Sequence, residues 1–187
     1  MDFTPSYIMD RNARFLIKEW LGDDLRFLVM LRNPMERAYS HYCHAIRHWL
    51  PGSRWVDEMG YPVEKLSFRD AIEEEPARMV FDPVHARHLS YFAKGLYHSQ
   101  LVRWFKLFDR SKFTIIVLEN LVANPQPELE KLESALGVSF SGLELPNLNA
   151  QSDNQLSKDD YRWLWERYEP EVRKLSNDFG INVSSWI

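Results

Sequence analysis

Two short, continuously apolar runs separate longer stretches in which apolar residues recur every three or four positions. The runs Arg26–Leu31 and Phe113–Leu118 have the length and composition of buried strands. Strands of this kind that alternate with helices indicate an α/β fold, in which a parallel sheet is covered on both faces. The expected helices are Asp10–Leu21, Pro34–Trp49, Phe68–Glu75, His98–Phe108, Pro127–Leu136 and Lys158–Phe179, with a loop at Pro51–Pro62 and irregular structure at Pro76–Lys94.

The junction after the first predicted strand has the features of an anion site. Asn33 is a good N-cap, Pro34 suits the first helical position, and Glu36 lies where a capping-box carboxylate reaches back. Arg32 precedes this cap, and a cation is unfavourable beside the positive end of a helix unless an anion lies between them. A phosphate would satisfy both groups. The alternative is that Arg32 pairs with a carboxylate such as Asp23 or Asp24.

Composition limits the class of protein. A chain of 187 residues with 45% hydrophobic and 14% aromatic residues fits one globular domain, residues 1–187. A formal charge of −4 argues against general nucleic-acid binding. The single cysteine, Cys43, excludes an intramolecular disulfide and fits a reducing compartment. No apolar run approaches the roughly 20 residues of a membrane span, and Met1 begins no signal peptide, so we expect a cytoplasmic chain without a membrane segment.

The segment Leu31–Tyr42 reads L-R-N-P-M-E-R-A-Y-S-H-Y and resembles a motif of known enzymes. It is similar to the 3′-phosphate-binding motif of sulfotransferases that use 3′-phosphoadenosine 5′-phosphosulfate (PAPS), most closely the bacterial members and the heparan sulfate branch. The resemblance implies that Arg32 and Ser40 bind the 3′-phosphate of the nucleotide.

Three further stretches resemble the same family, in the same order. Phe3–Tyr7 is similar to its T-P-S-Y segment, Gly95–Leu101 to its G-x-Y-x-x-Q-L helix start, and Phe113–Gly137 to its late strand, E-x-L turn and following helix. The resemblance implies a phosphate-loop (P-loop) NTPase-like fold with a parallel sheet flanked by helices. It also implies that Tyr97 and Gln100 line the substrate cleft; the alternative is a helix start packed into the core.

One hallmark of that family is absent from this sequence. The family carries a K-x-G-T-T loop that holds the 5′-phosphosulfate, whereas no glycine here is followed by lysine. The family's general base lies upstream of the T-P-S-Y segment, so the catalytic residues here are unknown. We expect the chain to be the C-terminal portion of a longer, N-terminally truncated sulfotransferase; the alternative is a whole protein that has lost transfer chemistry.

The predicted function is therefore transfer of a sulfuryl group from PAPS to a hydroxyl or amine, with a carbohydrate as the expected acceptor. The alternative is a non-catalytic module that binds a nucleotide or sulfated glycan. A nucleotide kinase would require a G-K-[ST] loop, and Leu118-Glu119 is the nearest approach to its acidic strand end.

Other candidate sites are less well supported by the sequence. His41, His44 and His48 recur at helical spacing, but a closed metal site requires further ligands, so we expect no metal. The loops Gly52–Tyr61 and Asp82–Lys94 are expected to form the acceptor pocket. The cations available there for an anionic sugar are Arg78, His85, Arg87, His88 and Lys94, which Glu73, Glu74, Glu75 and Asp82 offset.

Overall fold

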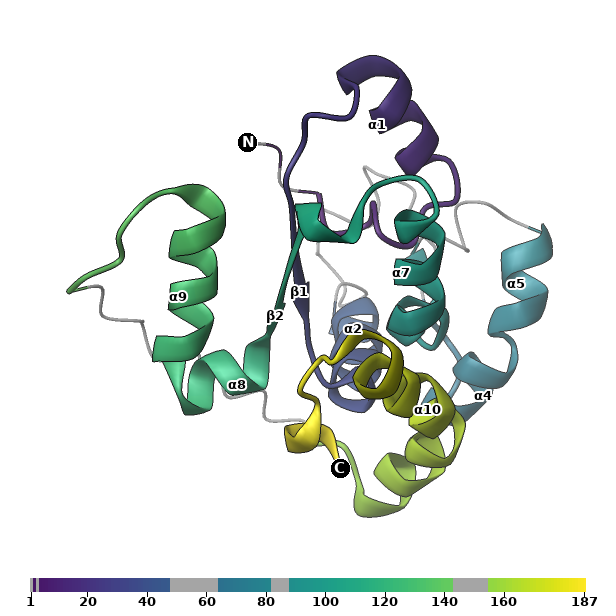
Figure 1. The fold of residues 1–187 in the computed structure, drawn as a ribbon. Coiled ribbons are helices and arrows are strands. Elements are labelled where there is room, and N and C mark those ends of the chain that lie inside the picture. Colours follow the sequence, from purple (N-terminus) through teal and green to yellow (C-terminus); the bar gives the residue numbers. More distant parts are fainter. Residues whose placement is uncertain (1, 3, 48–63, 82–87, 143–154) are drawn as a thin grey trace. The chain divides into compact units, whose positions relative to one another are not determined.

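The computed structural model describes residues 2, 4–47, 64–81, 88–142 and 155–187, in which helices flank a short parallel sheet (Figure 1). Its strands and helices, in chain order, are α1 Ala13–Leu21, β1 Phe27–Leu31, α2 Pro34–Arg47, α4 Phe68–Glu73, α5 Glu75–Phe81, α7 Tyr97–Phe105, β2 Phe113–Val117, α8 Leu118–Ala123, α9 Pro125–Leu136 and α10 Lys158–Phe179. Short 3₁₀ turns lie at Ala93–Gly95, Arg110–Lys112 and Ser184–Trp186. The predicted α/β class is confirmed.

Both predicted strands form, and they pair in parallel with Phe27 opposite Phe113 and Leu31 opposite Val117. Continuous apolar runs are typical of strands in parallel sheets, whose two faces are usually both covered. We expected both faces of the sheet to be covered, and for β1 this was wrong, because the side chains of Leu28 and Met30 are 47% and 53% exposed. Alternate residues of β1 therefore contact the core, and the intervening ones reach the surface.

One predicted irregular segment and several predicted helix boundaries were wrong. Glu75–Phe81 is the helix α5, although we expected irregular structure from Pro76 onward. Proline is tolerated in the first turn of a helix, where its missing N–H has no intrahelical partner, so Pro76 opens this helix rather than preventing it. For the same reason α9 begins at Pro125 rather than Pro127. The helix α8 was not predicted, because its six residues are too few to show a period.

The chain divides into two compact units, and it passes from one unit to the other four times. The first unit contains Met1–Asn33, Tyr97–Gln151 and Pro170–Ile187, and the second contains Pro34–Leu96 and Ser152–Glu169. Each unit is assembled from separate stretches of the chain. The expectation of one domain over residues 1–187 stays a prediction.

One buried cluster of the first unit lies where the two strands begin. Trp104 and Phe108 at the end of α7 pack with Ala13 of α1, and Phe27 and Phe113 join them. The Phe27 and Phe113 rings stack with centroids 4.6 Å apart, and Trp104 meets Phe27 edge-on at 5.4 Å. These aromatic contacts fix α1 and α7 against the starts of both strands.

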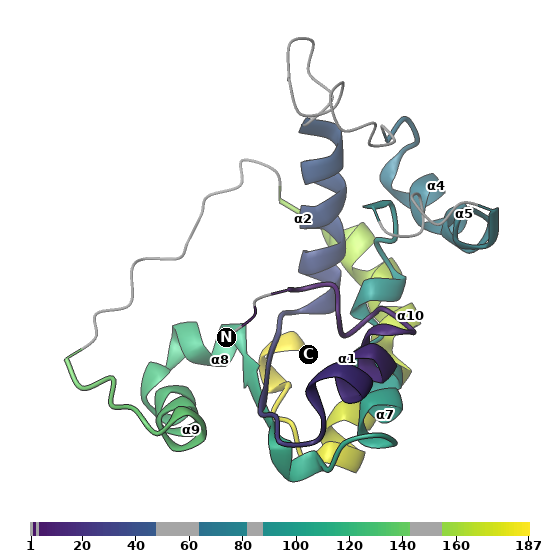
Figure 2. The same cartoon turned by 90° about the horizontal axis from the view of Figure 1, so that it is seen from above.

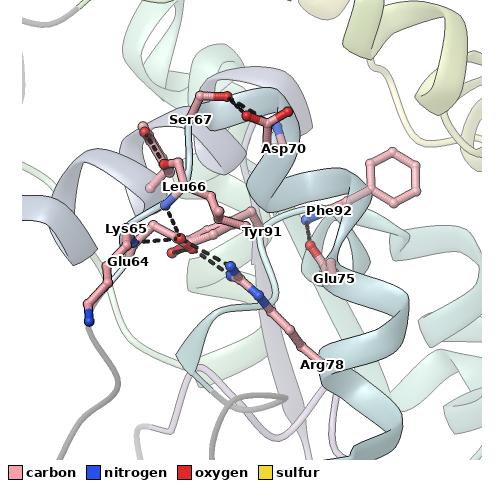
Figure 3. A network of polar contacts seen from close by, with 10 residues as sticks. Glu64, Lys65, Leu66, Ser67, Asp70, Glu75, Arg78, Tyr91 and Phe92 are labelled. Carbon is pink, nitrogen blue, oxygen red and sulfur yellow. Dashed lines mark hydrogen bonds and ion pairs between the residues drawn. The ribbon is translucent and has the colours of Figure 1, made fainter.

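A buried ion pair organises the second unit (Figure 3). The Arg78 guanidinium donates to both carboxylate oxygens of Glu64, at 2.6 and 3.1 Å, and the Tyr91 hydroxyl donates to the same carboxylate at 2.9 Å. The backbone N–H groups of Lys65 and Leu66 complete its partners. Burial raises the pKa of Glu64, but these hydrogen bonds outweigh burial and leave the pKa below its ordinary value. Glu64 is therefore ionised at neutral pH.

Replacing Arg78 by methionine should destabilise the protein by about 3 kcal/mol, because it leaves the buried Glu64 carboxylate without its cation. The double variant Glu64→Gln/Arg78→Met should recover most of this loss, since it removes both charges. Urea unfolding at pH 7 measures all three proteins. The stability that ionised Glu64 contributes is fully present above the pKa of about 4.5 that this carboxyl has in the unfolded chain. It is lost as the pH falls through the lower pKa of the folded protein. The difference in unfolding free energy between wild type and Arg78→Met should therefore shrink in acid.

Arg69→Met is the matched control. Arg69 pairs with Asp160 at the same 2.6 Å, but its side chain is 46% exposed, so its removal should cost less than about 1 kcal/mol. Equal losses for the Arg69 and Arg78 variants would contradict the importance of the buried pair.

Candidate functional site

The candidate site begins at the carboxyl end of β1. Leu31 is buried as the last strand residue, Arg32 is partly buried, and Asn33 is 5% exposed. The helix α2 starts at Pro34, which confirms the predicted strand-to-helix junction. In parallel sheets, ligands bind beyond the carboxyl ends of the strands, which is where the chain places Arg32.

Glu119 holds the backbone at this junction. It follows β2 as the second residue of α8, and its Oε1 accepts a hydrogen bond of 2.8 Å from the Asn33 N–H. Its Oε2 accepts a second bond of 2.8 Å from the indole N–H of Trp186, whose side chain is fully buried. One carboxylate thus joins the end of β1, the end of β2 and the C-terminal segment. The sequence marked Glu119 as part of a turn and as the nearest approach to an acidic strand end, but it did not predict these two bonds, because neither donor is near Glu119 in the chain.

Tyr97 provides a second anchor for the same stretch. Its hydroxyl donates to the Arg32 carbonyl at 3.0 Å, and its ring centroid lies 6.1 Å from that of Trp186. The structure thus brings together two predicted site residues, Arg32 and Tyr97. Gln100 follows one turn later on α7 and is 1% exposed. The predicted contact of Tyr97 and Gln100 with an acceptor stays a prediction.

No carboxylate of the described residues compensates the charge of Arg32. Within the described ranges Arg32 forms no ion pair, and Asp23 instead pairs with Lys18 at 3.1 Å. The alternative in which Arg32 pairs with Asp23 or Asp24 was therefore wrong. A partly buried guanidinium without a carboxylate partner is a strong donor available to an anion.

Ser40 belongs to the second unit, where it lies partly buried on α2. The helix places it six residues after Pro34, which is about 9 Å along the axis at 1.5 Å per residue. Its shared role with Arg32 in holding a phosphate stays a prediction.

The histidines of α2 form no metal site among the described residues, which contain no group of three His, Cys, Asp or Glu side chains suited to a metal. His48 lies outside these residues. His41 packs edge-on against Tyr91 with ring centroids 4.9 Å apart. Burial, followed by the charges of Lys94 and Arg37, lowers the pKa of His41 to about 3, so its imidazole is neutral at pH 7.

The predicted acceptor loops are only partly described. Gly52–Tyr61, His85 and Arg87 lie outside the described residues. Of the cations considered for an anionic sugar, Arg78 is occupied by the buried Glu64, which argues against that use. The Glu75 carboxylate accepts bonds of 2.6 Å from the N–H groups of Phe92 and Ala93 and so holds the backbone before α7.

Within the described parts of the chain, no helix combines the length and the apolar character needed to cross a bilayer.

The chain is similar to known proteins over most of its length. The model of the family described as "Sulfotransferase domain" matches residues 12–174. The chain is 29% identical over 140 residues to heparan sulfate glucosamine 3-O-sulfotransferase 6 of Homo sapiens, covering 74% of this chain and 35% of that relative. It is 28% identical over 138 residues to heparan sulfate glucosamine 3-O-sulfotransferase 3A1 of Mus musculus, covering 74% and 30%. The chain thus spans about a third of the length of these relatives.

A solved structure shares the fold. The crystal structure of a sulfotransferase from Alicyclobacillus acidocaldarius superposes with a TM-score of 0.69 at 26% identity, covering 97% of this chain and 64% of that one.

Replacing Glu119 by glutamine should lower the free energy of unfolding by about 1–3 kcal/mol. A glutamine side chain has one acceptor oxygen, so one of the two N–H groups would face the amide nitrogen, which is itself a donor. Urea unfolding followed by tryptophan fluorescence measures the loss.

Glu130→Gln is the matched control, because exposed Glu130 only accepts a bond from exposed Gln126, and it should change stability by less than about 0.5 kcal/mol. If the Glu119 variant is no less stable than this control, Glu119 does not hold the junction.

Proposed function

Since this chain belongs to the sulfotransferase family, we propose that its protein moves a sulfuryl group from PAPS to a hydroxyl or amine of a carbohydrate acceptor. In this proposal Arg32 and Ser40 bind the 3′-phosphate of the nucleotide, and Tyr97 and Gln100 lie on the acceptor side. PAPS itself supplies the reactive sulfuryl group as a phosphosulfate anhydride.

The observation that carries the nucleotide assignment is the environment of Arg32. Its backbone is held by the Tyr97 hydroxyl at 3.0 Å, and the next residue is held by Glu119 at 2.8 Å, yet its guanidinium has no carboxylate partner among the described residues. A positioned cation without a counter-charge costs little reorganisation when it binds an anion. The planar guanidinium also matches two oxygens of a phosphate.

The helix that begins after Arg32 also supports binding of a 3′-phosphate. The helix α2 begins at Pro34, directly after this stretch, and the N-terminus of a helix favours an anion. The Ser40 hydroxyl, about 9 Å along this helix, adds a neutral donor. These groups bind and orient the nucleotide rather than make or break bonds, so their contribution is to hold the donor in place for transfer.

The names of the relatives support a carbohydrate acceptor, because they describe enzymes that act on glucosamine of heparan sulfate. Tyr97 lies beside the proposed nucleotide site, because its hydroxyl donates to the Arg32 carbonyl while the residue starts α7. Its role in this proposal is positioning, since the hydroxyl proton is already committed to that carbonyl.

Replacing Arg32 by alanine should weaken the binding of adenosine 3′,5′-bisphosphate by roughly 10–100-fold, which corresponds to losing one charge-assisted contact of about 1.5–3 kcal/mol. Binding of adenosine 5′-monophosphate, which has no 3′-phosphate, should change much less. Isothermal titration calorimetry on the longest native form of the protein measures both ligands.

Arg26→Ala is the matched control, because Arg26 is an exposed arginine just before β1 and six residues from Arg32. Equal losses of affinity for the two nucleotides in the Arg32 variant, or equal effects of the Arg32 and Arg26 substitutions, would overturn the assignment of the 3′-phosphate.

A transfer assay with PAPS and a panel of amino sugars and oligosaccharides then separates an enzyme from a binding module. Nucleotide binding without transfer to any acceptor would favour the module.

A further inference from the structure

A second group of cations lies in the first unit, at the contact between α1 and α7. Both helices belong to one packed cluster, in which Ala13 of α1 meets Trp104 of α7, and Figures 1 and 2 together show α1 near one end of α7. Arg14 follows Ala13 and Arg103 precedes Trp104, so this packing brings their chain positions together. The Arg14 guanidinium also donates to the Arg11 carbonyl at 2.6 Å. Arg11, Arg14 and Arg103 form what we call the arginine cluster.

The arginine cluster has no ion pair within the described part of the chain. The neighbouring Asp10 carboxylate is used by the helix start, where it accepts bonds from the N–H groups of Asn12 and Ala13. Glu171, the acidic residue that acts on Arg103, has both oxygens bonded to Ser99, at 2.6 and 3.0 Å. The Nε of Arg103 is buried and has no hydrogen-bond partner. Three positive charges are thus gathered while the nearby carboxylates serve other groups.

The electrostatics show that this arrangement is unfavourable by itself. Burial lowers the pKa of Arg103, and the charges of Arg14 and Arg11 lower it further, while Glu171 opposes them. Like charges held together in a partly dry environment repel more strongly than in water. A buried guanidinium nitrogen without an acceptor adds a desolvation cost. An anion placed among the three side chains would relieve all of these costs.

We propose that Arg11, Arg14 and Arg103 form a binding site for a sulfate or phosphate group. A tetrahedral oxyanion presents oxygens in several directions, so it can accept from guanidinium groups of two helices, whereas one carboxylate presents two oxygens in a plane. The site is separate from the proposed nucleotide site. Arg103 lies six residues after Tyr97, about 9 Å along α7, toward the strand starts where Trp104 contacts Phe27.

The test is thermal unfolding of the protein in sodium sulfate, against sodium chloride of matched ionic strength. Wild type should melt about 3–5 °C higher in sulfate than in chloride when sulfate is present at roughly ten times its Kd. Arg103→Gln and Arg14→Gln should lose this difference. Without sulfate, Arg103→Gln should melt no lower than wild type, because the substitution removes a repelled charge; marked destabilisation by this variant would argue for a structural role instead.

Two controls separate this site from general salt effects and from the proposed nucleotide site. Arg26→Gln removes an exposed charge elsewhere in the unit and should keep the sulfate response. Arg32→Ala should also keep it, so the two proposals fail independently. A sulfate response that survives in both cluster variants, disappears in Arg32→Ala, or is absent from wild type would overturn the proposal.

Further arms of the experiment identify the source of the anion. Inorganic phosphate, a sulfated tetrasaccharide and its unsulfated counterpart are compared in wild type and Arg103→Gln. A response to the sulfated but not the unsulfated sugar, lost in Arg103→Gln, supports a site for a sulfated glycan. A response to phosphate alone, also lost in the variant, supports a site for a phosphate group.

Discussion

The carboxylate of Glu119 is the interaction on which the candidate site depends. It accepts from the Asn33 N–H after β1 and from the Trp186 indole near the C-terminus, at 2.8 Å in each case. The strands have only five residues each, so the hydrogen bonds between them do not position the backbone that follows each strand. Without a partner, the Asn33 N–H would be a buried donor, which costs about 1–3 kcal/mol. Glu119 and the Tyr97 bond to the Arg32 carbonyl therefore define where the chain turns from strand to helix.

This fixed backbone explains how Arg32 can remain without a carboxylate partner in the part of the chain that the structure describes. A side chain on a mobile segment would move toward the nearest acidic group, but here the peptide group between Arg32 and Asn33 is held by Tyr97 at its carbonyl and by Glu119 at its N–H. Asp23 meanwhile is drawn to Lys18 at 3.1 Å, and the Lys112 ammonium donates to the Asp23 carbonyl. The free energy of holding a cation in place is thus supplied by folding rather than by binding, which is the general advantage of a preorganised site.

The sequence predicted those parts of the fold that local chemistry determines. Apolar runs marked both strands, the Asn33-Pro34 pair marked the start of α2, and the period of Lys158–Phe179 marked α10 with both bounds correct. It did not predict the partners of Glu119, because the two bonds join residues 86 and 67 positions apart. It also treated Arg78 as available to a ligand, whereas the fold buries Glu64 beside it. Family resemblance supplied the roles of Arg32 and Ser40, which local patterns alone leave open.

The protein handles its buried charges in two different ways. Glu64 and Arg78 are a closed set: the carboxylate has its cation, a hydroxyl and two backbone donors, so an external ion would gain nothing there. Arg32 and Arg103 are open, since each is partly buried and lacks a carboxylate partner among the described residues. Burying a charge costs free energy unless a partner is provided, and folding has provided one for Glu64. The described residues provide no such partner for either open arginine, so uncompensated burial, rather than the number of cations, is the feature that points to a binding site instead of a structural ion pair.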